Sequence, residues 1–274
     1  MFKKATRKQA KLRLAIQGPS GSGKTTWALT IASGLGNKIA HMDTERSSAS
    51  LYSDEFNFDT ANINNPYEPE KFIQGIKDAE EGGYDVLIID SYTHEWLWCI
   101  DMANKLSQGG GNSFTAWAKI TPRHDALINA ILNSNIHIIC CMRSKQEYVM
   151  EEGKNGKQIP KKVGMAAVQR EGLDYEFTIV FELGMNHMAT CTKDRSKLFA
   201  DKDVELSSDI PKQLLNWLNE GDAAPTAVLD PFASSQTIED VKRVWNANKD
   251  QQSNAMFKRQ AEDAKARVSI HTAA

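Results

Sequence analysis

AIQGPSGSGKTTWAL, residues 15–29, joins an apolar run to a segment with helical periodicity. Within it, Gly18 to Thr25 fit the spacing G-x-x-x-x-G-K-[ST], which cradles nucleotide phosphates. Glycines let backbone N–H groups curl around a β-phosphate, while Lys24 reaches the β and γ oxygens and the Thr25 hydroxyl binds Mg²⁺. We therefore predict ATP and Mg²⁺ as ligands. The predicted phosphate-binding residues are Gly18, Pro19, Ser20, Gly21, Ser22, Gly23, Lys24, Thr25 and Thr26.

The alternative explanation is a glycine-rich turn that carries a lysine by accident. The strand expected before the loop and the helix expected to begin near Lys24 weigh against it, because a helix N-terminus adds positive charge facing the phosphates. Two carboxylates support a nucleotide site. Asp90 ends the apolar run 86–90, where it can hold Mg²⁺ through water, although it could instead cap the following helix.

Glu45 bears on the reaction. It follows the apolar run 39–42. In the helicase and recombinase branch of the ATPases that carry such a phosphate loop, this position holds the carboxylate that activates water. Hydrolysis is therefore favoured over phosphoryl transfer to a metabolite, which needs no such base. A solvated loop acid beside Asp43 and Arg46 is the alternative.

The spacing of apolar runs indicates an α/β fold. Runs at 12–16, 39–42, 86–90 and 136–140 alternate with helix-like segments, which predicts a mostly parallel central sheet covered on both faces. Runs at 177–183 and 188–192 predict an antiparallel hairpin at the end of this sheet. Thr121 and Pro122 are expected to begin a helix that ends near Asn133.

Composition and length divide the chain into three parts. We expect an ATPase core over 1–220, a linker over 221–236 and a small helical segment or tail over 237–274. Its apolar runs fall short of the roughly 20 residues that a membrane helix needs, and the basic N-terminal segment lacks signal-peptide features. The four cysteines contain no CxxC pair, which predicts a reducing cytoplasm and no metal site among them. The net charge of −2 neither favours nor excludes a nucleic-acid partner.

Several longer motifs carry a family resemblance. They are GPSGSGKTTWAL (18–29), HMDTERSSASLY (41–52), YDVLIIDSYTHEW (84–96), WAKITPRHDALINAI (117–131), CMRSKQEYV (141–149), PKKVGMAAVQREGLDYEF (160–177) and TKDRSKLF (192–199). Together these motifs resemble bacteriophage AAA-type nucleotide-binding proteins with a RecA-like core, which include RecA-like members of the Sak group of phage single-strand annealing proteins. The resemblance covers about residues 2–220. One departure is Ser47-Ser48, where a glycine is expected.

The resemblance implies a RecA-type fold, ATP binding with Mg²⁺, assembly into a ring or filament, and single-stranded DNA handling in phage recombination. It implies phosphate and metal roles for Lys24 and Thr25, a catalytic role for Glu45 and a Walker B role for Asp90. Arg143 corresponds to the polar residue that senses the γ-phosphate; a surface arginine is the alternative. Lys193 and Arg195 resemble the cations that RecA-like subunits insert into a neighbour's site, although an exposed hairpin end would explain them equally well.

RecA-like proteins bind DNA through loops after two core strands. The candidates are the glycine-rich stretch 108–113 and the segment after Arg143, where residues 143–170 carry seven basic and three acidic side chains, a net charge of +4. The predicted DNA-binding residues are Lys145, Tyr148, Lys154, Lys157, Lys161, Lys162 and Arg170. A solvated lysine-bearing hairpin is the alternative. We expect core or subunit-interface roles, and not stacking on DNA bases, for Trp96, Trp98 and Trp117. His94 is expected to cap or hydrogen-bond near the nucleotide.

The leading hypothesis is a phage-encoded, cytoplasmic ATPase that assembles on single-stranded DNA and promotes annealing or strand exchange. A single-strand DNA-binding protein is a further candidate partner, and no membrane is involved. Two other functions stay open: a replication helicase or helicase-loader ATPase, and a nucleotide switch that acts on a protein partner. A small-molecule kinase is more distant, because Glu45 and the lack of an evident lid oppose it.

Overall fold

The computed structural model describes residues 6–109, 112–152, 158–200 and 202–222, with side chains of 146–165 excepted. It further describes 232, 235, 237–249, 252, 257–258, 261–262 and 264–265. The chain forms two compact units, Met1–Asp222 and Ala223–Ala274.

A mostly parallel sheet organises the first unit. Its described strands are β1 (Arg13–Gly18), β2 (Ile39–Asp43), β3 (Asp59–Asn62), β4 (Val86–Asp90), β5 (His137–Glu152), β6 (Gln158–Ala167), β7 (Ile179–Leu183), β8 (Ala189–Asp194) and β9 (Asp203–Val204). They lie in the order β3-β2-β4-β5-β1-β7-β8-β9, with β6 paired to β5 outside this path. Pairing is parallel from β3 to β7 and antiparallel for β7–β8 and β8–β9. The predicted parallel sheet and terminal hairpin are therefore confirmed.

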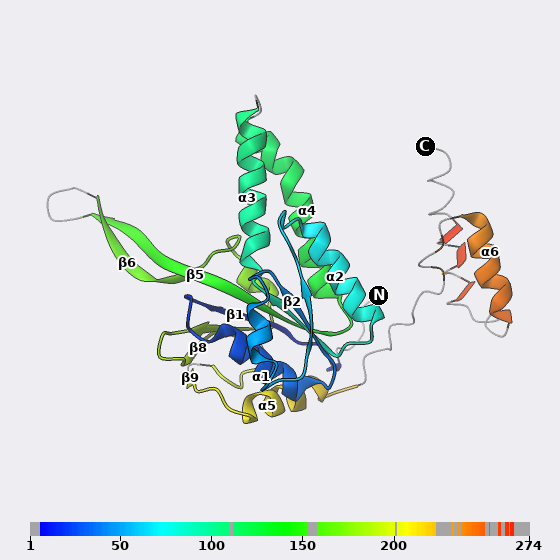
Figure 1. Ribbon diagram of the computed structural model, residues 1–274, viewed down its shortest axis with the longest axis horizontal. Coiled ribbons are helices and arrows are strands. Elements are labelled where there is room, and N and C mark those ends of the chain that lie inside the picture. The colour runs from blue at the N-terminus through cyan, green and yellow to red at the C-terminus, as the bar shows by residue number, and fades with distance from the viewer. Residues whose placement is uncertain are drawn as a thin grey trace. The chain divides into compact units, whose positions relative to one another are not determined.

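Helices cover both faces of this sheet (Figure 1). They are α1 (Lys24–Leu35), α2 (Pro69–Glu81), α3 (Thr93–Gln108), α4 (Ser113–Asn133) and α5 (Asp209–Asn219), with short 3₁₀ turns at Ser48–Tyr52 and Leu173–Glu176. Leu14 and Ile16 of β1 pack on the face covered by α1 and α5, and Ala15 packs on the face of α2 and α4. This alternation follows from the two-residue period of a strand and gives the unit a core on each side of the sheet.

The predicted start of α4 is wrong. The helix begins at Ser113, where the Asn112 side chain accepts a 2.8 Å hydrogen bond from the Thr115 amide, and Pro122 lies inside it. Proline removes one helical N–H donor. The helix nevertheless continues, because Ile120 before the proline and Leu127 after it are buried in apolar clusters, and this packing outweighs the local signal.

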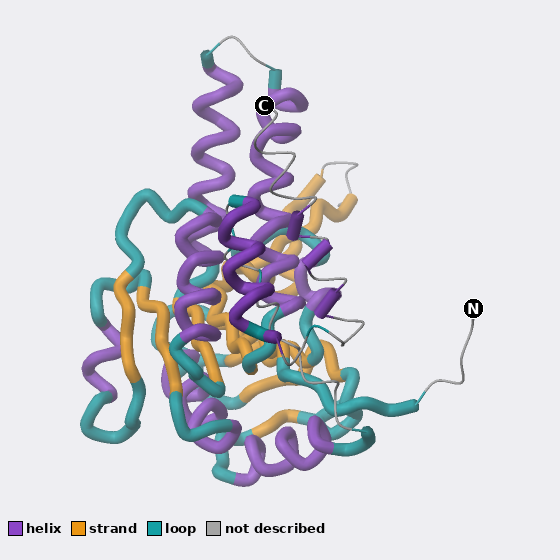
Figure 2. Tube along the Cα trace, turned by 90° about the vertical axis from the view of Figure 1, so that its right-hand side faces the viewer, coloured by secondary structure: helices purple, strands orange, loops and turns teal. Residues whose placement is uncertain are grey.

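Helices α3 and α4 lie side by side and project from the sheet in both views (Figures 1 and 2). Trp98, Cys99, Ala103, Ala116 and Ile120 form a buried cluster between them, and the Trp96 and Trp117 rings lie 5.5 Å apart against it. The tryptophans therefore pack within this pair of helices. The predicted glycine-rich loop joins the two helices, with residues 110–111 outside the described part.

Strand β5 has two parts. His137 to Arg143 pair within the central sheet, and Ser144 to Glu152 pair only with β6. Figure 1 shows these two strands running outward from the core as a ribbon. The segment after Arg143 thus forms a strand pair, and residues 153–157, which connect the two strands in the sequence, lie outside the described part.

The second unit contains α6 (Ile238–Ala247), which begins with a capping box between Thr237 and Asp240. Val241 of this helix is buried with Phe232, Phe257, Ala261 and Ala264. The described residues from 257 to 265 are helical. Across both units, no helix in the described part is long and apolar enough to span a bilayer.

Candidate nucleotide site

The register of the sheet brings the predicted site residues to one edge. Gly18 at the end of β1 is the pairing partner of Arg143 on β5, and Asp43 at the end of β2 is the partner of Asp90 on β4. Because these strands are parallel, their carboxyl ends all open on the same edge of the sheet. Residues separated by up to 125 positions, from Gly18 to Arg143, therefore surround one site.

The loop from Gly18 to Thr25 has the backbone of a phosphate cradle. Gly21 and Gly23 have φ angles of 81° and 89°, which side-chain-bearing residues rarely adopt. A Cβ on Gly18 would lie 2.5 Å from the Ser22 Oγ and 2.9 Å from the backbone carbonyl oxygen of Leu183, so this position also requires glycine. Ser20 and Gly21 are exposed and Ser22 is buried, with Pro19, Gly23, Lys24, Thr25 and Thr26 between these extremes.

Lys24 and Thr25 begin α1 and both side chains face the loop region. The Lys24 Nζ donates a 2.8 Å hydrogen bond to the Pro19 carbonyl. The Thr25 hydroxyl donates a 2.7 Å hydrogen bond to Asp90 Oδ2. Asp90 is only 5% exposed, and burial raises the pKa of its carboxyl to about 6, with further contributions from Glu45 and Asp43. An acid held in this way gains from a nearby cation, since a positive charge offsets both burial and repulsion.

Glu45 and Arg143 meet across the edge. The guanidinium Nε and an Nη of Arg143 lie 3.0 and 2.7 Å from the same Glu45 oxygen. The loop that carries Glu45 is fixed by Asp43, whose carboxylate accepts hydrogen bonds from the Glu45 amide at 2.5 Å and the Ala49 amide at 3.1 Å. Glu45 therefore contacts the predicted phosphate sensor, Arg143, and its charge helps to raise the pKa of the predicted metal acid, Asp90.

A hydrogen-bonded network joins the ends of β2 and β4. The Thr44 amide donates to the Asp90 carbonyl at 2.8 Å, and the Ser91 amide donates to the Thr44 hydroxyl at 2.7 Å. His94 Nδ1 lies 2.6 Å from that hydroxyl, and its ring stacks on Tyr67 with centroids 5.0 Å apart. Burial and the Arg143 charge lower the pKa of His94. His94 thus hydrogen-bonds beside Glu45, in the neighbourhood predicted for it.

The turn between β7 and β8 was not foreseen as part of the site. His187 Nδ1 lies 3.1 Å from the Ser22 carbonyl oxygen, and the Trp27 indole N–H donates to the His187 carbonyl at 3.2 Å. The turn therefore rests against the phosphate loop. The sequence signal for it, Gly184 to Met188 between two strands, is that of any hairpin turn and does not identify the contact.

Lys193 and Arg195 lie away from this edge. Lys193 pairs with Val180, which in turn neighbours Ala15, and β8 runs antiparallel, so the two cations lie toward the amino end of β1. The Lys193 ammonium and an Arg195 Nη donate to the carbonyls of Asp174 and Tyr175 at 2.8 and 2.7 Å. The fold does not bring them to the phosphate loop of their own chain.

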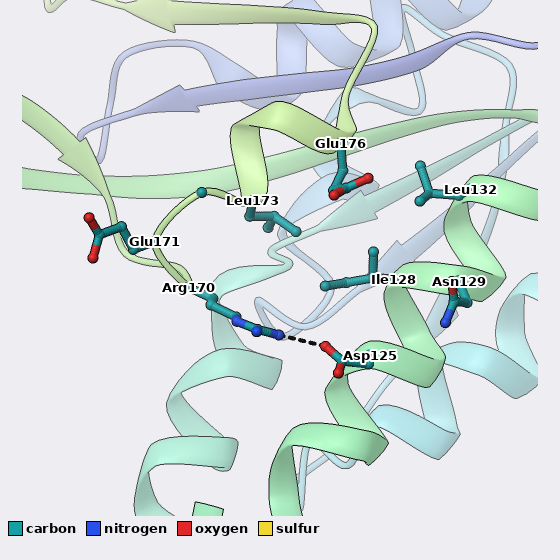
Figure 3. Close-up of a pocket in the computed structure, with 9 residues that line it drawn as sticks. Asp125, Ile128, Asn129, Leu132, Arg170, Glu171, Leu173 and Glu176 are labelled. Atoms are coloured by element: carbon teal, nitrogen blue, oxygen red, sulfur yellow. Dashed lines mark hydrogen bonds and ion pairs between the residues drawn. The ribbon is translucent and has the colours of Figure 1, made fainter.

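The predicted DNA-binding residues are spread along and beside the ribbon. Lys145 is exposed on β5, the backbones of Tyr148, Lys161 and Lys162 belong to the paired strands, and Lys154 and Lys157 lie outside the described residues. Arg170 follows β6 and forms a 2.5 Å ion pair with Asp125 of α4 (Figure 3). That pair lines a pocket of about 370 Å³ that also contains Glu171 and Glu176. Its acidic lining is unsuited to a phosphate, so it is distinct from the nucleotide site.

The fold and the loop at Gly18–Thr25 define a P-loop nucleotide-binding protein. A family model described as an AAA domain matches residues 10–205, which include every strand of the parallel sheet. The chain belongs to this AAA domain family, whose members are typically ATPases that use ATP with Mg²⁺. No curated protein matches the chain.

The residues present fit such a ligand. The glycine cradle is too tight for side chains at Gly18, the α1 N-terminus faces it, and the Thr25 hydroxyl with Asp90 offers two oxygen ligands of the kind that Mg²⁺ prefers. Lys24 and Thr25 would hold phosphate and metal, and Asp90 would hold the metal through water.

Proposed function

We propose that this AAA-family ATPase is phage-encoded, assembles on single-stranded DNA and promotes annealing or strand exchange during recombination. The observation that carries the proposal is the β5–β6 ribbon. Strand β5 leaves the central sheet at Arg143, beside the candidate nucleotide site, and continues outward paired only with β6. The resemblance to RecA-like phage annealing proteins supports it further. ATP binding and DNA binding would then use two parts of one strand.

The proposed chemistry is hydrolysis with Glu45 as the base. ATP supplies the phosphoanhydride that is cleaved, and Mg²⁺ neutralises charge on its phosphates. Lys24 and the loop amides bind the phosphate oxygens, and the Glu45 carboxylate accepts a proton from the attacking water. Arg143 would bind the γ-phosphate, and its 2.7 Å contact with the Glu45 carboxylate supports a role beside the base.

We assign Lys193 and Arg195 to the nucleotide site of a neighbouring subunit. Their position toward the amino end of β1 excludes them from their own site, and the Asp174 and Tyr175 carbonyls hold both cations together. A cation inserted from a neighbour stabilises charge on the transferring phosphate and makes hydrolysis depend on assembly.

The charge of the ribbon is modest once the paired arginines are set aside. Arg143 is bound to Glu45 and Arg170 to Asp125, so the remaining residues 144–169 carry five lysines and three glutamates, a net charge of +2. Four of those lysines are at positions 154, 157, 161 and 162. Lys161 and Lys162 pair with Val149 and Tyr148, Glu151 and Glu152 pair further out along the ribbon, and Lys154 and Lys157 lie outside the described residues. The proposal therefore depends on these four lysines more than on the total charge.

The test compares ATP hydrolysis with and without single-stranded DNA. The variants are a quadruple alanine change at Lys154, Lys157, Lys161 and Lys162, and Lys24→Ala. A matched control replaces four lysines that are exposed elsewhere in the unit, Lys71, Lys77, Lys202 and Lys212. Both quadruple variants lose four positive charges, so general electrostatics cannot distinguish them.

The proposal predicts that DNA stimulates hydrolysis by the parent protein and the control, and that the hairpin variant loses this stimulation while its basal rate remains. Lys24→Ala loses hydrolysis in both conditions. DNA affinity should fall with salt, with a slope that the hairpin variant reduces. Hydrolysis indifferent to DNA, with no DNA binding at low salt in the presence of a non-hydrolysable ATP analogue, would overturn the proposal and favour a switch acting on a protein.

A further inference from the structure

A second group of chemically active side chains lies between α3 and α4. Glu95 and Cys99 are one helical turn apart on α3, and His124 faces them from α4. Both Glu95 oxygens lie close to His124 Nδ1, at 3.0 and 3.1 Å, and the Cys99 Sγ lies 3.0 Å from Glu95 Oε1. One ligand atom from each residue can be chosen so that all lie within 4.8 Å of one another.

This cluster is fully enclosed. Glu95 and Cys99 are 0% exposed and His124 is 1% exposed. An ionised carboxylate at this depth needs a positive partner, because an isolated buried charge is strongly unfavourable. The His124 Nε2 is also buried and has no hydrogen-bond partner in the described part of the chain. None of the three side chains contacts the phosphate loop residues, so the nucleotide chemistry does not account for them.

We propose that Glu95, Cys99 and His124 bind a zinc ion. Thiolate, imidazole and carboxylate are the ligands that zinc takes in proteins, with bond lengths of about 2.0 to 2.3 Å. A tetrahedral arrangement at those lengths separates ligand atoms by about 3.3 to 3.8 Å. The observed distances from Glu95 to Cys99 and His124, 3.0 and 3.1 Å, differ from these values by less than about 1 Å, and all three ligand atoms lie within 4.8 Å of one another.

The charges balance. One carboxylate, one thiolate and one neutral imidazole carry a total charge of −2, which Zn²⁺ neutralises. Binding breaks the Cys99 S–H bond, forms a zinc–sulfur bond and releases the proton to solvent.

Three protein ligands leave one tetrahedral position. A cavity of about 120 Å³ adjoins His124 and is also lined by Trp96, Trp117, Thr121 and Arg170, whose guanidinium is paired with Asp125. A water molecule needs much less space than this, so water can supply the fourth ligand. The ion would fasten α3 to α4 at the level of Trp96, whose ring lies 5.1 Å from the His124 ring.

The expectation that the cysteines take part in no metal site rested on the absence of a CxxC pair. The geometry points to the opposite conclusion for Cys99, because its partners are not other cysteines. The cluster combines an i, i+4 pair on one helix with a histidine 25 residues further along the chain, and only the packing of the two helices brings them together.

The test uses the full-length protein, stripped of metal with a chelator and then titrated with Zn²⁺ in excess Mg²⁺, which blocks adventitious binding at the nucleotide site. The variants are Cys99→Ser, His124→Gln and Glu95→Gln. Cys191→Ser is the matched control, since Cys191 is half-buried on β8 and lies outside the cluster. Circular dichroism and ATP-analogue binding report whether each variant is folded.

We expect about one zinc ion per chain for the parent protein and for Cys191→Ser, and at least a 100-fold loss of affinity for Cys99→Ser. Cobalt in place of zinc should give a thiolate-to-metal charge-transfer absorption that Cys99→Ser abolishes and Cys191→Ser retains. Zinc should also raise the thermal midpoint of the parent protein. A folded parent protein that binds no stoichiometric zinc, or a folded Cys99→Ser variant that binds it equally well, would show that the three side chains form only a hydrogen-bonded network.

Discussion

Asp90 combines two demands at the scale of a single residue. Its carboxylate, the predicted metal ligand, accepts a hydrogen bond from the Thr25 hydroxyl, and burial raises its pKa to about 6. Because the pKa of Asp90 is higher in the folded state, protonation of this carboxyl stabilises the folded protein. This stabilisation is fully present below the unfolded pKa of about 4 and is lost as the pH rises through about 6. Without metal, the protein at neutral pH therefore bears the full cost of an ionised Asp90.

Asp90→Asn should consequently stabilise the metal-free and nucleotide-free protein at pH 8. The pKa difference of about two units corresponds to up to about 3 kcal/mol in the free energy of unfolding. The gain should shrink toward zero at pH 4, where Asp90 is protonated. Urea unfolding of the parent protein and Asp90→Asn at pH 8 and pH 4 measures the difference in the free energy of unfolding at each pH. Equal or lower stability of Asp90→Asn at pH 8 would contradict the assigned environment of this carboxyl.

Ser47 marks the departure from the expected family pattern. It has a φ of 64°, and Arg46 before it has a φ of 59°, so both occupy the left-handed region that favours glycine. Ser47→Gly should relieve this strain and stabilise the protein by about 0.5 to 1 kcal/mol, after the entropy that glycine gains in the unfolded chain. Thermal unfolding checks this, with Ser53→Gly as a control because Ser53 has an ordinary φ of −66°. A destabilised Ser47→Gly variant would count against the strained turn.

The residues of the nucleotide edge could be placed from the sequence because each has a local signal. The Gly18–Thr25 spacing is specific, and Asp90 and Glu45 each follow an apolar run of strand length. His187, Glu95 and His124 lack such a signal. Their contacts depend on how a turn packs on a loop or one helix on another, which a single sequence does not encode by spacing.

At the scale of elements, Arg13 joins β1 to the end of α4. This residue counts among the basic N-terminal side chains in the sequence, but it is 6% exposed. Its guanidinium donates to the carbonyls of Leu12 and Ile136 at 2.9 and 2.8 Å, and also to those of Leu132 and Ser134. Burial lowers its pKa to about 10, so it remains charged at neutral pH.

Arg13→Met should destabilise the protein by about 3 kcal/mol or more, because it leaves several buried carbonyls without a donor. Lys11→Met is the matched control, since Lys11 is exposed two residues earlier, and should change stability by less than about 0.5 kcal/mol. Chemical denaturation of both variants measures the difference. Equal changes in the free energy of unfolding for Arg13→Met and Lys11→Met would show that the Arg13 hydrogen bonds contribute little to stability.

Element boundaries were predictable where local chemistry and packing agree. The parallel strands and the β7–β8 hairpin follow from apolar runs. The start of α4 was misplaced because Pro122 resembles a helix start, while the buried face through Ile120 and Leu127 carries the helix across it. The sequence does not predict β3, because Asp59–Asn62 are exposed and show no alternating hydrophobic pattern. This strand is held by its backbone pairing with β2.

At the scale of the whole molecule, the proposed hydrolysis depends on assembly of the subunits. Lys193 and Arg195 lie away from the phosphate loop of their own chain, so in the proposed assembly a subunit with an intact site needs these cations from a neighbour. Mixing Lys24→Ala protein with a Lys193→Ala/Arg195→Ala protein should restore hydrolysis that neither has alone, to about a quarter of the parent rate if subunits mix randomly. A mixture as inactive as its components, despite exchange of subunits, would contradict action between subunits.

The central claim is that the edge formed by Gly18–Thr25, Glu45, Asp90 and Arg143 hydrolyses ATP. The measurement that tests it most directly is the single-turnover hydrolysis of bound ATP by Glu45→Gln, beside Glu55→Gln, a matched change at an exposed acid on the same segment. We predict that Glu45→Gln binds ATP but hydrolyses it at least about 100-fold more slowly, while Glu55→Gln behaves as the parent protein. Hydrolysis by Glu45→Gln at the parent rate would contradict the account.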